Sequence, residues 1–488
     1  MYTLSKVGLA LAALAPAVLA QSSSADLTPV YSTLYPSASE IAAAAATAAV
    51  GEETSSVTGS AFNRFVVIWL ENTDFDAAND QSDLQWLAKS GITLTNYFSV
   101  THPSEPNYVA AVGGDYFGMN SDNFFRIPSN VSNVVDLLDY KNISWAEYQE
   151  HQPYAGFQGF NYSNQESWAN DYVRKHNPLV IYDNVATNAT RLDNIKNFTS
   201  FYDDLDNKQL PQWSFITPNM TNDGHDSTID VSGAWSRSFL TPLLNNTYFM
   251  KDTLVLLTFD ENETYGDQNR IWALLLGGII PDDLKGTTDS NFYNHYSEIA
   301  TIEANWDLPH LGRGDIDANV FSIVANSSDV AIESIDYSNI YNNFSAPGYY
   351  NDDTIAIPPP NVDAVNRNGQ SILPAIKSVW SSAYSVYSAS TASSSLTYSA
   401  ETDNFASSGT PPSSTATGSS GSSAATTADS TLSTEVTGSA TATDSSASAS
   451  ETASGSSSAS SSSSSGAAGH LAPATGLLGL VLAALAMF

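Results

Sequence analysis

Five short runs of apolar residues recur along the middle of the chain, and polar residues follow four of them. The runs cover residues 64–70, 95–100, 213–217, 253–258 and 271–277. Continuous apolar runs of this length are typical of strands that are buried on both faces, as in a parallel sheet. We therefore expect these segments to form the centre of one sheet.

Segments with the apolar spacing of helices lie between the predicted strands. They cover residues 82–90, 106–112, 131–138, 231–244 and 296–306, and residues 41–50 could add a short helix. Strands that alternate with helices predict an α/β fold with a doubly wound, mostly parallel sheet and helices on both faces. In such folds, ligands bind beyond the carboxyl ends of the strands.

The amino-terminal end of the chain lacks this pattern. Residues 1–20 contain Lys6, an apolar run and then small residues, which is typical of a secretory signal peptide. Residues 21–60 are polar and rich in alanine, so we expect a low-complexity segment there. The folded domain should therefore cover residues 61–384.

The carboxyl-terminal end also differs from the middle of the chain. Residues 385–468 are mostly Ser, Ala, Thr and Gly, and they predict a disordered, O-glycosylated stalk. Residues 469–488 end in an uncharged apolar tail, which is typical of a GPI-anchor signal, with a plain transmembrane tail as the alternative. The sequence thus predicts a secreted protein that a GPI anchor holds at the plasma membrane or cell wall.

Composition narrows the possible partners. The chain carries 51 acidic residues against 17 Lys and Arg, for a net charge of −34, and so acidic a surface argues against nucleic acid as a partner. It has no cysteine, which excludes disulfides, a catalytic thiol and cysteine metal sites. Ten Asn-x-Ser/Thr sequons indicate N-linked glycans.

Oxygen-rich side chains follow two of the predicted strands. Glu71 and Asn72 come after the first strand, and Asp260 and Glu261 come after the strand at 253–258. Carboxyl ends of parallel strands meet at one edge of a sheet, and hard oxygen ligands of this kind suit a divalent cation. Capping of a following helix is the alternative for Asn72 and Asp260.

Ser104 stands where a strand gives way to a helix. It lies two residues before Pro106, a residue favoured in the first turn of a helix. A hydroxyl at this place faces unpaired N–H groups and a partial positive charge, which favour phosphate binding and an alkoxide. A simple helix cap is equally consistent with the spacing.

Six segments, in order along the chain, carry a resemblance to a known family. They are VIWLENTDF, THPSEPNYVAAVGGD, YVRKHNPLV, ITPNMTNDGHD, LLTFDENE and NHYSEIATIEANWDLPHLG. They resemble the fungal secreted acid phosphatases of the phosphoesterase group, which is related to bacterial phospholipase C and belongs with the alkaline phosphatase superfamily. The resemblance covers about residues 62–323 and implies an alkaline-phosphatase-like fold in a phosphoesterase catalytic domain.

The resemblance also implies roles for single residues. Ser104 would be the phosphorylated nucleophile, with His225 and His295 as catalytic partners. Substrate contacts would come from Asn107, His176 and Asn219, and metal ligands would be Glu71, Asn72, Asp260 and Glu261. Many relatives have His in place of Glu261 and Asp in place of Asn219. These departures favour one divalent cation over two and free His225 and His295 to act on phosphate as protonated donors.

Together these residues predict a double displacement on small phosphate esters through a phosphoserine. Histidines with a pKa of about 6.5 are mostly charged near pH 5, which predicts an acidic optimum. One alternative is a phospholipase C-type phosphodiesterase that shares the site, and another is a wall glycoprotein with a dead site. The signature of the metal-free histidine acid phosphatases, Arg-His-Gly-x-Arg-x-Pro, is absent. The role of His102 stays open.

Overall fold

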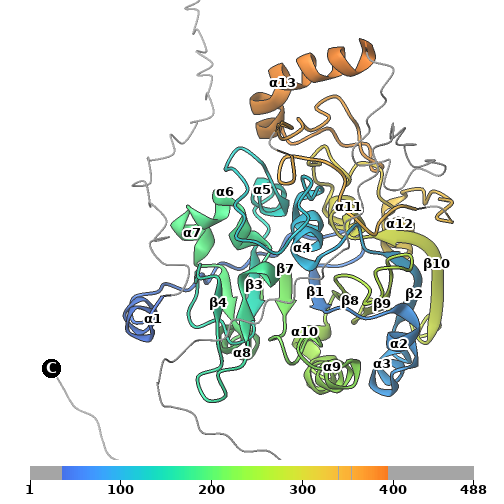
Figure 1. Cartoon of the computed structure of the whole chain (residues 1–488). Helices are drawn as coiled ribbons and strands as arrows, with labels where there is room; N and C mark the ends of the chain where they lie inside the picture. Colours follow the sequence, from blue (N-terminus) through green and yellow to red (C-terminus); the bar gives the residue numbers. More distant parts are fainter. Residues whose placement is uncertain (1–35, 339, 353, 394–488) are drawn as a thin grey trace, which may run out of the picture. The chain divides into compact units, whose positions relative to one another are not determined.

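The computed structural model describes residues 36–338, 340–352 and 354–393 (Figure 1). The predicted signal peptide, the predicted GPI-anchor signal and residues 394–468 of the predicted stalk lie outside these residues. In the described part of the chain, no helix has the length and apolar character needed to cross a membrane.

An eight-stranded sheet forms the centre of the fold. In spatial order its strands are β10 (Thr287–Asn294), β2 (Ile92–Phe98), β9 (Arg270–Leu276), β8 (Thr253–Phe259), β1 (Arg64–Leu70), β7 (Trp213–Thr217), β3 (Trp145–Gln149) and β6 (Ile195–Asn197). Neighbouring strands run parallel, except that β9 is antiparallel to β2 and β8. The predicted α/β fold with a mostly parallel sheet is therefore confirmed.

Helices cover both faces of this sheet (Figure 1). One face carries α2 (Phe75–Asp80), α3 (Ser82–Ala88), α8 (Phe198–Asp206), α9 (Ile229–Leu244) and α10 (Thr247–Met250). The other carries α4 (Ser104–Gly113), α5 (Val134–Tyr140) and α11 (Tyr296–Trp306). The remaining elements are α1 (Ala38–Ala45), β4 (Asn161–Tyr162), β5 (Tyr172–Val173), η1 (Arg174–His176), η2 (Leu179–Ile181), α6 (Asp183–Ala186), α7 (Ala189–Leu192), α12 (Ser322–Ser328) and α13 (Pro374–Ser393).

The apolar runs locate the inner strands well. β1 and β7 have the predicted bounds, and β2, β8 and β9 differ from theirs by at most three residues at either end. β3, β6 and β10 were not predicted, because their sequences WAEYQ, IKN and TTDSNFYN contain no continuous apolar run. β6 and β10 are the edge strands of the sheet, where polar side chains can reach water.

Two expected boundaries fall inside packed structure. Helix α1 buries Ile41 against Phe157 and Tyr172, so part of the predicted low-complexity segment joins the domain. At the other end, α13 continues through residues 385–393, which we assigned to the stalk. A run of Ser and Ala therefore continues a helix that the preceding apolar residues anchor, since Ile376 is buried in the core.

Glu303 is a buried carboxyl group on α11, away from the strand ends. Asn366 donates a hydrogen bond to its Oε2 over 2.9 Å, whereas Oε1 has no partner among the described residues. Burial, with the nearby charge of Asp315, raises the pKa of Glu303 well above its usual range. The folded protein therefore keeps this proton at pH values where the unfolded chain has lost it.

This difference predicts a pH-dependent stability. Below about pH 4.3 Glu303 is protonated in both the folded and the unfolded state. Above this pH the unfolded chain loses the proton while the folded protein keeps it. The free energy of unfolding should therefore fall as the pH rises. The loss can reach about 1.4 kcal/mol per pH unit for one proton. In Glu303→Gln, urea unfolding between pH 4.5 and 7.5 should show a smaller decrease than in the wild type. Parallel pH profiles of the two proteins would contradict this assignment.

Candidate active site

Polar side chains from several segments meet at the carboxyl ends of β1, β7 and β8. They are Glu71 and Asn72 after β1, Ser104 at the start of α4, His176 in η1, Asp223 and His225 after β7, and Asp260 after β8. All of them except Asn72 and His225 are buried. This is the edge of the sheet at which the strand pattern predicted chemistry.

The residues after β1 form hydrogen bonds to the loops that follow the two neighbouring strands. The Glu71 N–H donates to the carbonyl of Asp223 over 2.9 Å, and the Asn72 N–H donates to Asp260 Oδ1 over 3.1 Å. Asn72 has φ of 43°, a left-handed conformation that Asn tolerates better than most residues. The sharp turn at Asn72 therefore brings the loops of three neighbouring strands into contact.

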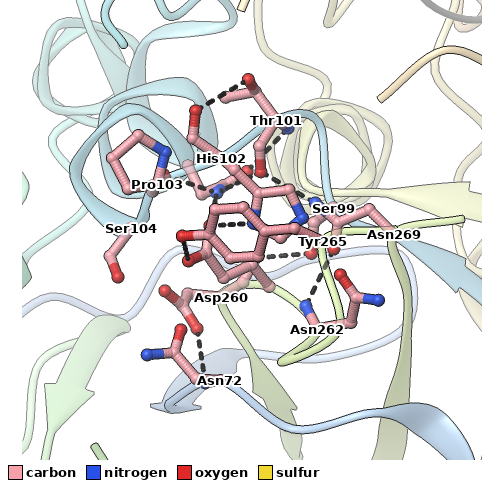
Figure 2. A network of polar contacts seen from close by, with 12 residues as sticks. Asn72, Ser99, Thr101, His102, Pro103, Ser104, Asp260, Asn262, Tyr265 and Asn269 are labelled. Carbon is pink, nitrogen blue, oxygen red and sulfur yellow. Dashed lines mark hydrogen bonds and ion pairs between the residues drawn. The ribbon is translucent and has the colours of Figure 1, made fainter. Parts of the chain in front are cut away.

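Ser104 is the first residue of the ten-residue helix α4, and its side chain is buried. Its Oγ donates to Glu71 Oε2 over 3.2 Å. Figure 2 shows the Ser104 hydroxyl next to the Asp260 carboxyl group. The hydroxyl therefore lies at a helix amino terminus, which attracts anions, and next to a carboxylate.

Three carboxyl groups crowd this site. Burial raises the pKa of Glu71 well above its usual range, and the charges of Asp260 and Asp223 raise it further. Burial also raises the pKa values of Asp223 and Asp260. Three buried carboxyl groups so close together are unfavourable in their ionised form unless a cation balances their charge.

The free ligand atoms fit a divalent cation. Asn72 Oδ1, Asp223 Oδ2 and Asp260 Oδ2 are buried without a well-aligned hydrogen-bond partner among the described residues. Glu71, His176 and His225 also offer one ligand atom each within 4.8 Å of one another. Carboxylate, amide and imidazole donors together form a site that hard and borderline cations can occupy.

His176 lies between two of the carboxyl groups. Its Nε2 is 3.1 Å from Glu71 Oε1, and its Nδ1 is 3.4 Å from Asp223 Oδ2. Its ring stacks on Tyr108, whose hydroxyl donates to Glu71. Burial, then the charges of Lys175 and His225, lowers the pKa of His176 well below its usual value. Desolvation therefore favours the neutral ring of His176.

His225 lies at the margin of the site and is partly exposed. Its Nδ1 is 2.7 Å from Asp226 Oδ1, and its Nε2 is 3.1 Å from the ammonium group of Lys175. Its backbone N–H donates to Asp223 Oδ1 over 2.8 Å. Both ring nitrogens therefore have partners, and the ring stands beside His176 at 5.8 Å between centroids.

Comparison with known proteins identifies the family of this chain. Residues 78–309 match the Phosphoesterase family. The probable acid phosphatase of Kluyveromyces lactis is 58% identical over 376 residues, which are 77% of this chain and 89% of that protein. The chain belongs to the fungal acid phosphatases of the Phosphoesterase family. The resemblance inferred from the six segments is thereby confirmed.

Further similarities extend the comparison. The acid phosphatase of Aspergillus fumigatus is 57% identical over 313 residues, which are 64% of this chain and 70% of that protein. A solved structure from the alkaline phosphatase superfamily, from Vibrio parahaemolyticus, aligns with a TM-score of 0.35 and 12% identity over 56% of this chain and 76% of that one.

In this acid phosphatase, His295 does not reach the carboxyl groups. Its Nε2–H donates to the backbone carbonyl of Asp260 over 2.7 Å, and its ring packs on Trp69 at 4.3 Å. Its Nδ1 faces the Tyr97 hydroxyl at 3.5 Å. The structure thus differs from the prediction that His295 contacts phosphate, because the ring packs in the core and donates its hydrogen bond to the Asp260 backbone.

Glu261 also lies apart from the three carboxyl groups. Its Oε2 is 2.8 Å from His102 Nδ1, and its Oε1 accepts from the Tyr265 hydroxyl over 3.2 Å. Figure 2 shows Tyr265 stacked over His102, with 3.8 Å between ring centroids. Burial lowers the pKa of His102 to about 4, so this ring is neutral near pH 5. Asp260 and Glu261 lie in a bend after β8, and their carboxyl groups have different hydrogen-bond partners.

Asn107 and Asn219 use their side chains to hold loops. Asn107 Oδ1 accepts from the N–H groups of residues 100 and 101, and its Nδ2 donates to two backbone carbonyls and to Glu261 Oε2. Asn219 Oδ1 accepts from the N–H groups of residues 221 and 222. A direct contact of either residue with substrate stays a prediction.

Sequence reasoning missed Asp223, Tyr108 and Lys175. Asp223 stands in the quoted ITPNMTNDGHD segment, after β7, so the strand-end argument could have found it. Lys175 precedes His176 in a chain with only 17 Lys and Arg residues, and this scarcity was a usable signal. Nothing in the sequence indicated that the Tyr108 hydroxyl would donate to Glu71.

Proposed function

We propose that the protein hydrolyses small phosphate monoesters at acidic pH, with Ser104 as the nucleophile and one divalent cation at the strand ends. The contact that carries this proposal is the hydrogen bond from Ser104 Oγ to Glu71 Oε2, at the amino terminus of α4 and beside three buried carboxyl groups. The names of the fungal relatives support the same reaction class.

Glu71, Asn72 and Asp260 would hold the cation, with Asp223 and His176 next to them. Buried oxygens of Asn72, Asp223 and Asp260 that lack well-aligned hydrogen-bond partners support this set. When bound, a divalent cation lowers the pKa of a nearby hydroxyl and offsets charge on phosphate oxygens. Glu261 is not in this set, because its carboxylate faces His102 and Tyr265.

The side chains of the site then have separate tasks. Glu71 orients the Ser104 hydroxyl, which attacks phosphorus in line with the leaving alcohol. The bond from phosphorus to the alcohol oxygen breaks, the proton of the Ser104 hydroxyl ends on the departing alcohol, and Ser104 becomes a phosphoserine. The partial positive charge at the amino terminus of α4 attracts the phosphoryl oxygens. Water then attacks the phosphoserine, which releases inorganic phosphate and restores the hydroxyl.

The site should prefer monoesters over diesters. A monoester keeps more negative charge on its non-bridging oxygens, and a cation with a helix amino terminus stabilises that charge in the transition state. We expect kcat/KM at pH 5 to be at least about tenfold higher for a monoester than for its methyl diester, a difference of about 1.4 kcal/mol in the barrier. Equal or higher efficiency on phosphatidylcholine would instead favour a phospholipase.

We also propose that the protein reaches the cell surface and stays there through a GPI anchor. The apolar, uncharged tail at residues 469–488 supports this proposal. Treatment of intact cells with phosphatidylinositol-specific phospholipase C should release most of the phosphatase activity into the medium. Mature protein that still ends in Phe488 by mass spectrometry would contradict the anchor.

A further inference from the structure

Lys175 places its ammonium group inside the acidic site. The residue lies in η1, one position before His176, and its side chain is 14% exposed. Its Nζ is 2.9 Å from Asp122 Oδ2 and 3.1 Å from His225 Nε2. Two partners on separate loops therefore fix the position of the ammonium group.

The contacts with Asp122 and His225 use two of the three N–H donors of the Lys175 ammonium group. His225 donates from Nδ1 to Asp226 over 2.7 Å, which leaves Nε2 as the acceptor for Lys175. Asp122 is shared, because its Oδ1 accepts the N–H of Glu105 in the first turn of α4. This chain of contacts links Lys175 to the helix that carries Ser104.

Lys175 also changes the charge that a substrate meets. Glu71, Asp223, Asp260 and the Lys175 partner Asp122 contribute four negative charges when ionised, and one divalent cation offsets two of them. Lys175 offsets a third, which lowers the repulsion of a phosphate dianion. Its ammonium group lies next to His225, which is partly exposed at the margin of the site.

The neighbouring cation is turned away from the site. Arg174 donates to the carbonyls of Phe125 and Val180, and its guanidinium lies over the Phe124 ring at 4.2 Å. Its position fits a role in holding the 122–126 loop. Of this adjacent pair, Lys175 is therefore the residue whose charge faces the carboxyl groups.

We propose that Lys175 is a further catalytic residue, whose ammonium group binds a non-bridging phosphoryl oxygen and takes the place that a second metal ion has in two-metal phosphatases. Asp122 and His225 are then positioning residues for it. This inference rests on the proposed phosphatase site. It gives the phosphate a second positively charged group beside the single proposed cation.

The test compares Lys175→Met with Lys285→Met, a matched change at an exposed lysine that pairs with Asp282. Each purified holoenzyme is assayed for monoester hydrolysis, for binding of inorganic phosphate by calorimetry, and for metal content. Lys175→Met should lower kcat/KM by about a hundredfold and weaken phosphate binding by at least about tenfold. Its metal content should equal that of the wild type, and Lys285→Met should match the wild type throughout.

Two results would overturn the inference. One is wild-type phosphate affinity in Lys175→Met, and the other is loss of metal from that variant, which would give the lysine a role in building the metal site. If Lys175→Met does not fold, Lys175→Arg keeps the charge and should retain phosphate affinity within about tenfold. The Ser104→Ala variant separates the proposal for Lys175 from the proposal for Ser104, because it should bind phosphate without turnover. An active Ser104→Ala variant would refute only the proposal that Ser104 is the nucleophile.

Discussion

Replacement of Ser104 by alanine should lower kcat on a phosphate monoester at pH 5 by at least about a thousandfold. The hydroxyl forms the covalent intermediate. In the variant, α4 and the carboxyl groups stay in place, and no water molecule is positioned as well as the hydroxyl to attack phosphorus. Rapid acid quench of the wild type during turnover, followed by mass spectrometry, should find phosphate on the peptide that contains Ser104.

Ser236→Ala is the matched control for this experiment. Ser236 is also buried on a helix, and its hydroxyl donates to the carbonyl of Ser232 over 2.7 Å, on the face of the sheet opposite α4. This variant should lose about 1 kcal/mol of stability and keep its activity within about threefold. A Ser104→Ala enzyme with a tenth of wild-type activity would remove Ser104 from the mechanism.

Asp260→Asn should strip the metal from the protein and reduce activity by at least about a hundredfold, or about 2.7 kcal/mol in the barrier. The substitution preserves the shape of the side chain but removes the charge that a divalent cation requires. Elemental analysis of the active wild-type protein should find about one divalent ion per chain. Active wild-type protein without a stoichiometric cation would refute the metal proposal.

Glu261→Gln provides the internal comparison. The sequence assigns Glu261 the same role as Asp260, whereas the structure turns its carboxylate toward His102 and Tyr265. We therefore expect Glu261→Gln to keep its metal. If Glu261→Gln lost the metal while Asp260→Asn retained it, the ligand set would have to be reassigned.

The inner strands and the strand-end residues could be predicted from the sequence. β1 and β8 are continuous apolar runs, and the residue after each run must leave the sheet at the same edge because the strands are parallel. That reasoning placed Glu71, Asn72, Ser104 and Asp260 in one site, and the structure brings them together. Burial of both sheet faces makes such runs necessary, so the sequence records them directly.

The direction of each side chain was decided only by the tertiary structure. His295 and Glu261 stand in the expected segments, yet one packs on Trp69 and the other pairs with His102. Conversely, Asp223 enters the site from the loop after β7 and Lys175 from the three-residue helix η1, and no periodic pattern predicts either segment. Strand burial is a local property that repeats along the chain, whereas the path of a loop depends on contacts between residues far apart in sequence. For that reason the sequence was enough to locate the edge of the sheet at which the site lies. Only the tertiary structure decided which polar side chains point into that site.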